Sequence, residues 1–151
     1  MTVSPRLLRT GMNLWPPFLG AGIRVTDIAA DWSSVTVTLR LNRLTRNYVG
    51  TAFGGSMSAM TDPFYMLLLT HRLGREYLVW DTAGEIRFLS PGRSTLTAYI
   101  SIDDATVDTI LDGTRDGAKS LTWFETAIVD ADGTTAATVR REVYVRKKRR
   151  D

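Results

Sequence analysis

Apolar and polar residues alternate along several segments of the chain. In the clearest one, Val35, Val37, Leu39 and Leu41 are separated by polar side chains. A period of two residues is typical of a strand with one buried face. Including this segment, residues 35–41, the sequence predicts six strands, the others at residues 23–30, 77–89, 94–102, 119–129 and 134–146. Turn-forming residues at 31–34 and 130–133 predict hairpins between neighbouring strands.

One segment is apolar without alternating. Residues 56–69 are mostly apolar and predict a helix from Gly55 to about Leu73, with Gly74 in position to form the C-cap. A helix that is apolar nearly all round is buried on all sides. The sequence therefore predicts one long central helix.

Two further segments have helical signals. Ser4 can cap a short helix over about residues 4–14, with Pro5 at its first position. The run Trp15-Pro16-Pro17 is predicted to end that helix, because a residue before proline avoids helical geometry. Residues 103–118 form either a partial helix or a long loop, since their glycines weaken a helix.

The order of elements is a helix, two strands, a long buried helix and four strands. Consecutive strands suit antiparallel pairing, which predicts an α+β fold in which one sheet wraps one helix. No internal repeat or second domain is visible, so residues 1–151 are predicted to form a single domain.

Charge is unevenly distributed. The net charge is +3, but five of the 19 basic residues lie in the tail, residues 146–151. Without the tail the chain is close to neutral. The tail could contact nucleic acid or a membrane surface, but no recognition helix or stacking motif accompanies it, so we expect no nucleic-acid partner. We interpret the tail as a solvated terminus.

The composition excludes several kinds of chemistry. The chain has no cysteine, which excludes disulfides, thiol catalysis and zinc–thiolate sites. His71 is the only histidine, so no metal or other cofactor is predicted. The start lacks a signal-peptide pattern, and the longest apolar stretch is shorter than the roughly 20 residues that span a membrane. We therefore expect a cytoplasmic protein without a membrane span.

A carboxylate interrupts the apolar central segment. Asp62 is followed by Pro63, and a buried carboxylate is costly unless something uses it. Asp62 is thus a candidate general base or nucleophile, and the sequence does not separate these two roles. The structural alternative is an aspartate that caps a helix restarting at Pro63.

The region around Asp62 resembles a known family. Asn47, Gly50, a Gly54-Gly55 pair and Asp62 match in register the motif of hotdog-fold acyl-CoA thioesterases, particularly the phenylacetyl-CoA type. The family carries His directly before the glycine pair, where this chain has Phe53. The variant motif is similar to a subgroup often labelled tetrameric acyl-CoA thioesterases. The resemblance covers about residues 15–146.

This resemblance implies hydrolysis of an acyl-CoA thioester to a free acid and CoA. It also implies a homodimer or homotetramer with sites at the dimer interface. Residues 86–91 resemble a strand end of related enzymes, in which a water-positioning Ser or Thr lies nine residues before Ser90. This chain has Asp81 there, either as a second carboxylate of the site or as an ion-pair partner of Arg87 or Arg93.

Thioester hydrolysis needs hydrogen-bond donors for the oxygen that becomes negatively charged. The backbone N–H groups at Gly54 and Gly55, at a helix N-terminus, are candidates for this oxyanion hole. In the alternative, these glycines only turn the chain into the helix. Phe53 could instead pack against an acyl chain, which leaves a non-catalytic acyl-CoA or fatty-acyl binding protein as the alternative function.

Substrate binding is assigned to the same region. Asn47 and Phe53 join Gly54 as candidate substrate-binding residues. CoA carries several phosphate charges, so basic residues are expected along its path, with Arg93 the first candidate. The next candidates are Arg72, Lys119, Arg140 and Arg141.

Overall fold

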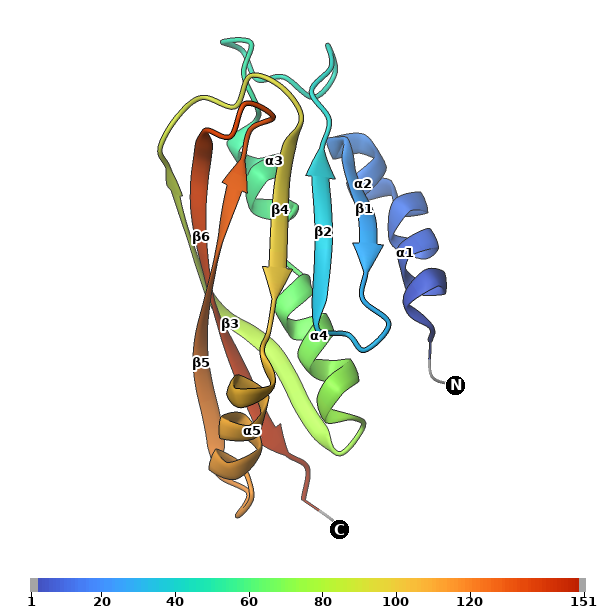
Figure 1. Ribbon diagram of the computed structural model, residues 1–151, viewed down its shortest axis with the longest axis vertical. Helices are drawn as coiled ribbons and strands as arrows, with labels where there is room; N and C mark the ends of the chain where they lie inside the picture. The colour runs from blue at the N-terminus through green and yellow to red at the C-terminus, as the bar shows by residue number, and fades with distance from the viewer. Residues whose placement is uncertain (1–2, 150–151) are drawn as a thin grey trace.

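The computed structural model describes residues 3–149. Its centre is one antiparallel six-stranded sheet with the strand order β1-β2-β4-β5-β6-β3 (Figure 1). All six predicted strands are present, with ends that differ by a few residues. The strands are β1 (Ile23–Ile28), β2 (Ser34–Leu39), β3 (Tyr77–Phe88), β4 (Leu96–Ser101), β5 (Lys119–Val129) and β6 (Thr135–Lys147).

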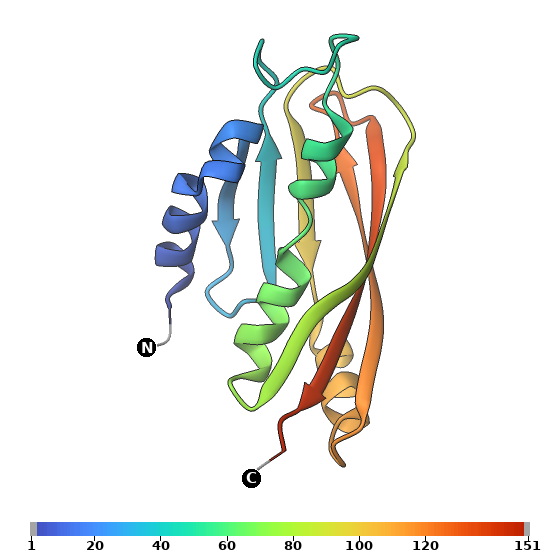
Figure 2. The same ribbon diagram turned by 180° about the vertical axis from the view of Figure 1, so that it is seen from behind.

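In the described part of the chain, five helices accompany the sheet. Figure 2 shows α3 and α4 lying end to end along one face of the sheet, with α1 and α2 beside β1. This arrangement confirms the predicted α+β hotdog fold, in which the sheet wraps a central helix. The helices are α1 (Pro5–Leu14), α2 (Pro16–Ala21), α3 (Gly54–Ala59), α4 (Phe64–Leu73) and α5 (Asp104–Gly113).

The central helix consists of two segments separated by a turn at residues 60–63. The N–H groups of Thr61 and Asp62 donate to carbonyls three residues back, at 3.2 and 3.3 Å, instead of continuing the α-helical pattern. Pro63 has no N–H to restore it. The chain therefore leaves α3 after Ala59 and starts α4 at Phe64.

The N-terminal prediction was incomplete. Trp15 ends α1 as predicted, but Pro16 and Pro17 begin α2 immediately afterwards. Proline is favoured in the first turn of a helix, where its missing N–H has no intrahelical partner to lose. The proline pair thus stops one helix and starts the next.

Of the two alternatives for residues 103–118, the partial helix is correct. The side chain of Asp103 caps α5 by accepting a hydrogen bond of 2.6 Å from the N–H of Thr106. The helix ends at Gly113, and Gly117 adopts a positive φ of 77° in the turn that follows. The glycines thus limit the length of the helix without preventing it.

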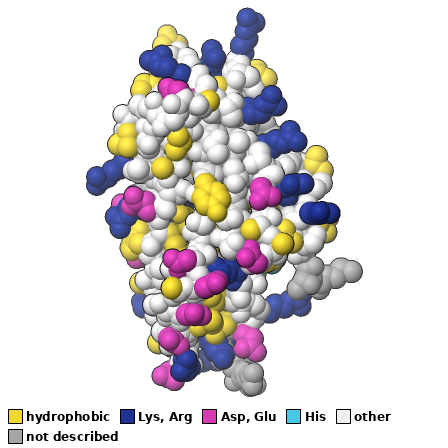
Figure 3. Space-filling view, viewed as in Figure 1, with side chains coloured by type: hydrophobic (Ala, Val, Ile, Leu, Met, Phe, Trp, Pro, Cys, Tyr) yellow, Lys and Arg dark blue, Asp and Glu magenta, His cyan; other side chains and the backbone are white. Residues whose placement is uncertain are grey.

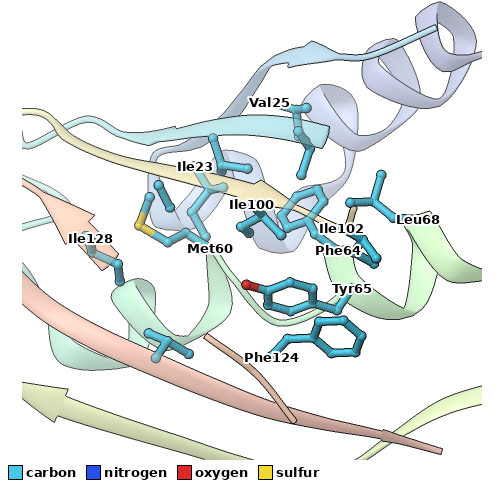
Figure 4. Packing of buried hydrophobic residues seen from close by; sticks show 14 of the residues in the cluster. Ile23, Val25, Met60, Phe64, Tyr65, Leu68, Ile100, Ile102, Phe124 and Ile128 are labelled. Carbon is cyan, nitrogen blue, oxygen red and sulfur yellow. The ribbon is translucent and has the colours of Figure 1, made fainter. Parts of the chain in front are cut away.

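The core lies between the sheet and the central helix. Figure 4 shows Tyr65 and Phe64 of α4 pointing into a cluster with residues from several strands. The Tyr65 ring stacks on Phe124 with centroids 4.7 Å apart, and its hydroxyl donates to the Glu125 carbonyl at 2.8 Å. The one polar atom of this buried ring is therefore satisfied.

The basic tail begins inside the sheet, which corrects the expectation of a wholly solvated terminus. β6 continues to Lys147, and the N–H of Lys148 donates to the Glu76 carbonyl at 2.8 Å. Arg146 donates to the Gly117 carbonyl at 2.9 Å. The last two tail residues, 150 and 151, lie outside the described residues.

Charged side chains are unevenly spread over the outer face of the molecule. Figure 3 shows most acidic side chains gathered over the half that carries α5, whereas basic side chains are spread over both halves. Within residues 3–149, no helix is long and apolar enough to cross a membrane.

Candidate functional site

Asp62 lies at the break between α3 and α4. Its carboxylate forms an ion pair with Arg141, with 2.8 Å between Oδ1 and Nη1, and its side chain is 62 % exposed. The expectation of a buried carboxylate was wrong for this chain, because the turn at residues 60–63 directs Asp62 away from the core. The capping alternative is also wrong, since α4 begins after Pro63 without a side-chain cap.

The buried partner of this ion pair is Arg141, whose side chain is only 9 % exposed. Its Nη2 donates to the Ser58 carbonyl at 3.0 Å and to the Ser58 hydroxyl at 3.4 Å. Gly84 faces it across the β3–β6 ladder, and a Cβ at Gly84 would lie 2.5 Å from Nη1. The missing side chain of Gly84 therefore leaves the space that the guanidinium occupies. Sequence reasoning had placed Arg141 along the CoA path as a basic residue and missed this role.

Asp81 lies on β3 opposite Val143 and is half-buried. Its Oδ1 is buried and has no hydrogen-bond partner within residues 3–149. Burial raises the pKa of Asp81 to about 6; the nearby Asp62 carboxylate adds to this rise, and Arg141 opposes it. Asp81 therefore belongs electrostatically with Asp62 and Arg141.

The alternative pairing of Asp81 with Arg87 or Arg93 was wrong. No such ion pair occurs within the described part of the chain.

Arg140, the neighbour of Arg141, lies on the opposite face of β6, since successive strand residues alternate. There Arg140 contacts Glu85 at 3.3 Å and stacks over the Trp123 ring at 4.7 Å.

Gly54 and Gly55 form the first turn of α3, and Phe53 precedes them as an N-cap without a side-chain hydrogen bond. A Cβ at Gly55 would lie 2.4 Å from the Phe53 ring, and one at Gly54 would lie 2.8 Å from the Phe88 ring. The two glycines therefore let aromatic rings approach the backbone closely. The first N–H groups of a helix have no intrahelical acceptor, which leaves these donors available.

An open cleft of about 420 Å³ connects the two parts of the predicted site. Gly55 and Asp62 both line it, together with Trp15 and Phe18, whose rings are 5.3 Å apart. These aromatic residues lie at the start of α2 and within it. Sequence reasoning missed this wall because it did not predict α2.

Asn47 lies beside a second cleft of about 430 Å³, which is lined by Gly54, Phe88 and residues 89–92 among others. Its amide donates to the Thr51 hydroxyl at 3.0 Å and to the Ala52 carbonyl at 3.2 Å. Its oxygen accepts from backbone N–H groups of the same loop. Asn47 thus holds the loop that leads into α3.

Two other predicted residues lie away from Asp62 and are engaged structurally. Arg93 has an exposed side chain, and its backbone N–H donates to Asp130 at 2.7 Å. Arg72 donates to the Ile102 carbonyl at 2.6 Å and pairs with Asp104, which ties α4 to the start of α5. No cluster of three His, Cys, Asp or Glu residues within residues 3–149 could hold a metal ion.

Several solved structures have the same fold. A protein of unknown function from Pseudomonas aeruginosa, PA5026, described as a probable thioesterase, has a TM-score of 0.83 at 14% identity, covering 98% of this chain and 99% of that one. The thioesterase HI1161 from Haemophilus influenzae has a TM-score of 0.69 at 15% identity, with 97% and 93% covered.

The PaaI protein from the phenylacetic acid degradation operon of E. coli has a TM-score of 0.61 at 15% identity, with 94% and 91% covered. These likenesses confirm the hotdog fold. Among curated proteins none matches this chain.

A family model described as "Domain of unknown function (DUF4442)" matches residues 5–145, nearly the whole chain. The chain therefore belongs to the DUF4442 family.

Proposed function

We propose that this protein hydrolyses an acyl-CoA thioester to a free acid and CoA. The observation that carries the proposal is that Gly55 and Asp62 line one cleft whose other wall is apolar and aromatic. A thioester carbonyl in this cleft would have a candidate oxyanion donor and a carboxylate within the same space. Hotdog-fold proteins named as thioesterases support the same reaction class.

Asp62 is the central residue of the proposed reaction. As a general base, it takes a proton from water while the water oxygen attacks the thioester carbonyl. The resulting oxyanion accepts a hydrogen bond from the N–H of Gly55. Collapse of the tetrahedral intermediate then breaks the C–S bond and releases the CoA thiolate, which takes up a proton. As a nucleophile, Asp62 attacks the carbonyl itself, the C–S bond breaks with release of the CoA thiolate, and water then hydrolyses the acyl–aspartyl anhydride to the free acid and the Asp62 carboxylate.

Asp81 assists this chemistry in the proposal. Its pKa of about 6, raised first by burial and then by the Asp62 charge, makes it able to give or take a proton near neutral pH. Two carboxylates whose environments differ this strongly are typical of acid–base sites. The half-buried position of Asp81 and the exposed one of Asp62 supply that difference.

The acyl group is proposed to pack against the aromatic wall formed by Trp15 and Phe18, with Phe53 at its edge. Arg93 is proposed to attract the phosphates of CoA, and Asn47 to hold the adjoining loop in place. Among residues 3–149, the edge strand β3 pairs with β6 alone, and it exposes Leu78 and Trp80, which supports assembly into a homodimer or homotetramer.

The test is release of free thiol from a panel of acyl-CoAs of increasing chain length. We expect turnover by the wild type and a fall in kcat of about 100-fold or more in Asp62→Asn, the range associated with loss of a general base. Asp108→Asn, which removes an exposed carboxylate on α5, serves as the matched control and retains full activity. No turnover of any chain length, or full activity in Asp62→Asn, would refute the proposal.

One observation favours a second function. The Phe53 ring lies against Gly55. Phe53 occupies the position at which the thioesterase family motif has a histidine, directly before the glycine pair. If this ring blocks the oxyanion donor, the cleft binds an acyl-CoA without hydrolysing it. Calorimetric binding of acyl-CoA, with the thioester recovered intact, would distinguish this binding function from catalysis.

A further inference from the structure

We infer that Arg141 is a positioning residue of this site, a buried guanidinium that fixes the Asp62 carboxylate at the mouth of the cleft. This inference rests on the proposed function. It assigns a role in the reaction to a residue on the last strand, 79 positions after Asp62 in the sequence.

The geometry around Arg141 is directed toward Asp62. One terminal nitrogen pairs with Asp62 Oδ1 at 2.8 Å, and the other donates to Ser58 on the preceding helix. The guanidinium therefore bridges the end of α3 and the turn that carries Asp62. The carboxylate that it binds through Oδ1 belongs to a residue that also lines the cleft.

The surroundings of Arg141 are arranged at some cost to stability. Glycine destabilises a strand, because its flexible backbone loses more entropy on folding and it has no side chain to pack. Gly84 nevertheless occupies this position of β3, where it leaves space for the Arg141 guanidinium. The Nε atom of Arg141 is buried without a hydrogen-bond partner within residues 3–149. Because Asp62 is 62 % exposed, its charge would stay solvated if an apolar residue replaced Arg141. A role in packing alone therefore does not account for this arginine.

Asp81 supplies an independent observation. Its buried oxygen has no donor, and the charged groups acting on it are Asp62 from the helix break and Arg141 from β6. Arg141 thus lies in the electrostatic field of both carboxylates. Removing its positive charge releases Asp62 and also raises the proton affinity of Asp81.

The test compares three variants that disturb the same contact differently. Arg141→Gln removes the charge. Arg141→Lys keeps the charge but replaces the planar guanidinium, which can bind two partners at once, by a single ammonium group. Gly84→Ala keeps every charged group but puts a methyl group where Nη1 lies. Arg115→Gln, which removes an exposed guanidinium just after α5, is the matched control. Circular dichroism verifies that each variant is folded.

With the acyl-CoA that the wild type turns over fastest, Arg141→Gln is expected to lower kcat by about 100-fold, the loss associated with misplacing a catalytic group by about 1 Å. KM stays close to its wild-type value, because Arg141 is not placed against the substrate. Gly84→Ala and Arg141→Lys are expected to fall between wild type and Arg141→Gln. Unchanged kcat in Arg141→Gln, or an equal loss in Arg115→Gln, would overturn the assignment.

A second readout does not depend on catalysis. Carboxyl ¹³C NMR titration of Asp81 is expected to show a higher pKa in Arg141→Gln than in the wild type, because the nearby positive charge is gone. An unchanged titration would refute the electrostatic contact. If the wild type hydrolyses no acyl-CoA, the proposed function fails, and this titration alone decides whether Arg141 acts on the carboxylates. If Arg141→Gln does not fold, Gly84→Ala provides the kinetic measurement, because it disturbs the position of the guanidinium without removing its charge, and unchanged kcat in Gly84→Ala would then overturn the assignment.

Discussion

Replacing Asp81 by asparagine is expected to stabilise the protein above pH 6 and to change little at pH 3. Asparagine resembles the protonated carboxyl in shape and carries no charge. The folded chain favours the protonated form of Asp81, since burial, aided by the Asp62 charge, raises its pKa from 3.8 to about 6. The variant therefore removes a charge that the folded state holds unfavourably.

The direction follows from proton binding. Between pH 3.8 and about 6, the folded state keeps the Asp81 proton while the unfolded state has released it. Wild-type stability consequently falls as pH rises through this window and levels off above it. A pKa that is higher by about two corresponds to about 3 kcal/mol of unfolding free energy once Asp81 is fully ionised. Asp81 is only half-buried, and solvent screening reduces the expected gain to about 1 kcal/mol.

The assay is urea unfolding of both proteins from pH 3 to pH 8 at one fixed protomer concentration, because association contributes to apparent stability. The informative quantity is the difference in unfolding free energy between Asp81→Asn and wild type at each pH. Asp108→Asn, at an exposed position on α5, is the control, with a difference expected to stay near zero. A constant difference across the range, or destabilisation of Asp81→Asn at pH 8, would refute this account of the site.

Three further predictions test other parts of the structure. Tyr65→Phe removes the hydroxyl that donates to the Glu125 carbonyl and is expected to cost about 1 kcal/mol in urea unfolding, whereas Tyr48→Phe, at a fully exposed ring, costs nothing measurable. Burial alone would raise the pKa of Asp130, but three backbone N–H groups and a hydroxyl lower it overall. Asp130→Ala should therefore cost about 2 kcal/mol at pH 7, a loss that shrinks below pH 4 as the wild-type carboxylate is protonated. Trp15→Ala should raise KM for long-chain acyl-CoAs more than for acetyl-CoA; equal effects would exclude it from acyl binding.

The strands were readable from the sequence because each buries one face. In β2, for example, Val35, Val37 and Leu39 are buried and the residues between them are not. The helices were less readable. The same proline pair that ends α1 also begins α2, and a local pattern does not distinguish these two uses of proline.

The site was readable only in part. The register of the motif located Gly55 and Asp62, which line one cleft, but it did not indicate that Asp62 is exposed. Arg141 did leave a signal, because it occupies an inward position between the buried residues Val139 and Val143. Its partner lies 79 residues earlier in the chain, and pairing over that distance is set by the sheet rather than by local sequence.

Two features of the cluster argue that it exists for chemistry rather than for stability. A buried oxygen of Asp81 and a buried nitrogen of Arg141 both lack hydrogen-bond partners within residues 3–149. Each such group costs about 1–3 kcal/mol, and the chain holds two of them beside the same helix break. A leucine or methionine at position 141 with an alanine at position 84 would fill the same space without the unpaired nitrogen of Arg141. Unsatisfied polar groups in a native structure call for an explanation, and a catalytic role is one of the recognised ones. The location of the cluster next to the cleft of Gly55 and Asp62 makes that explanation the one to test first.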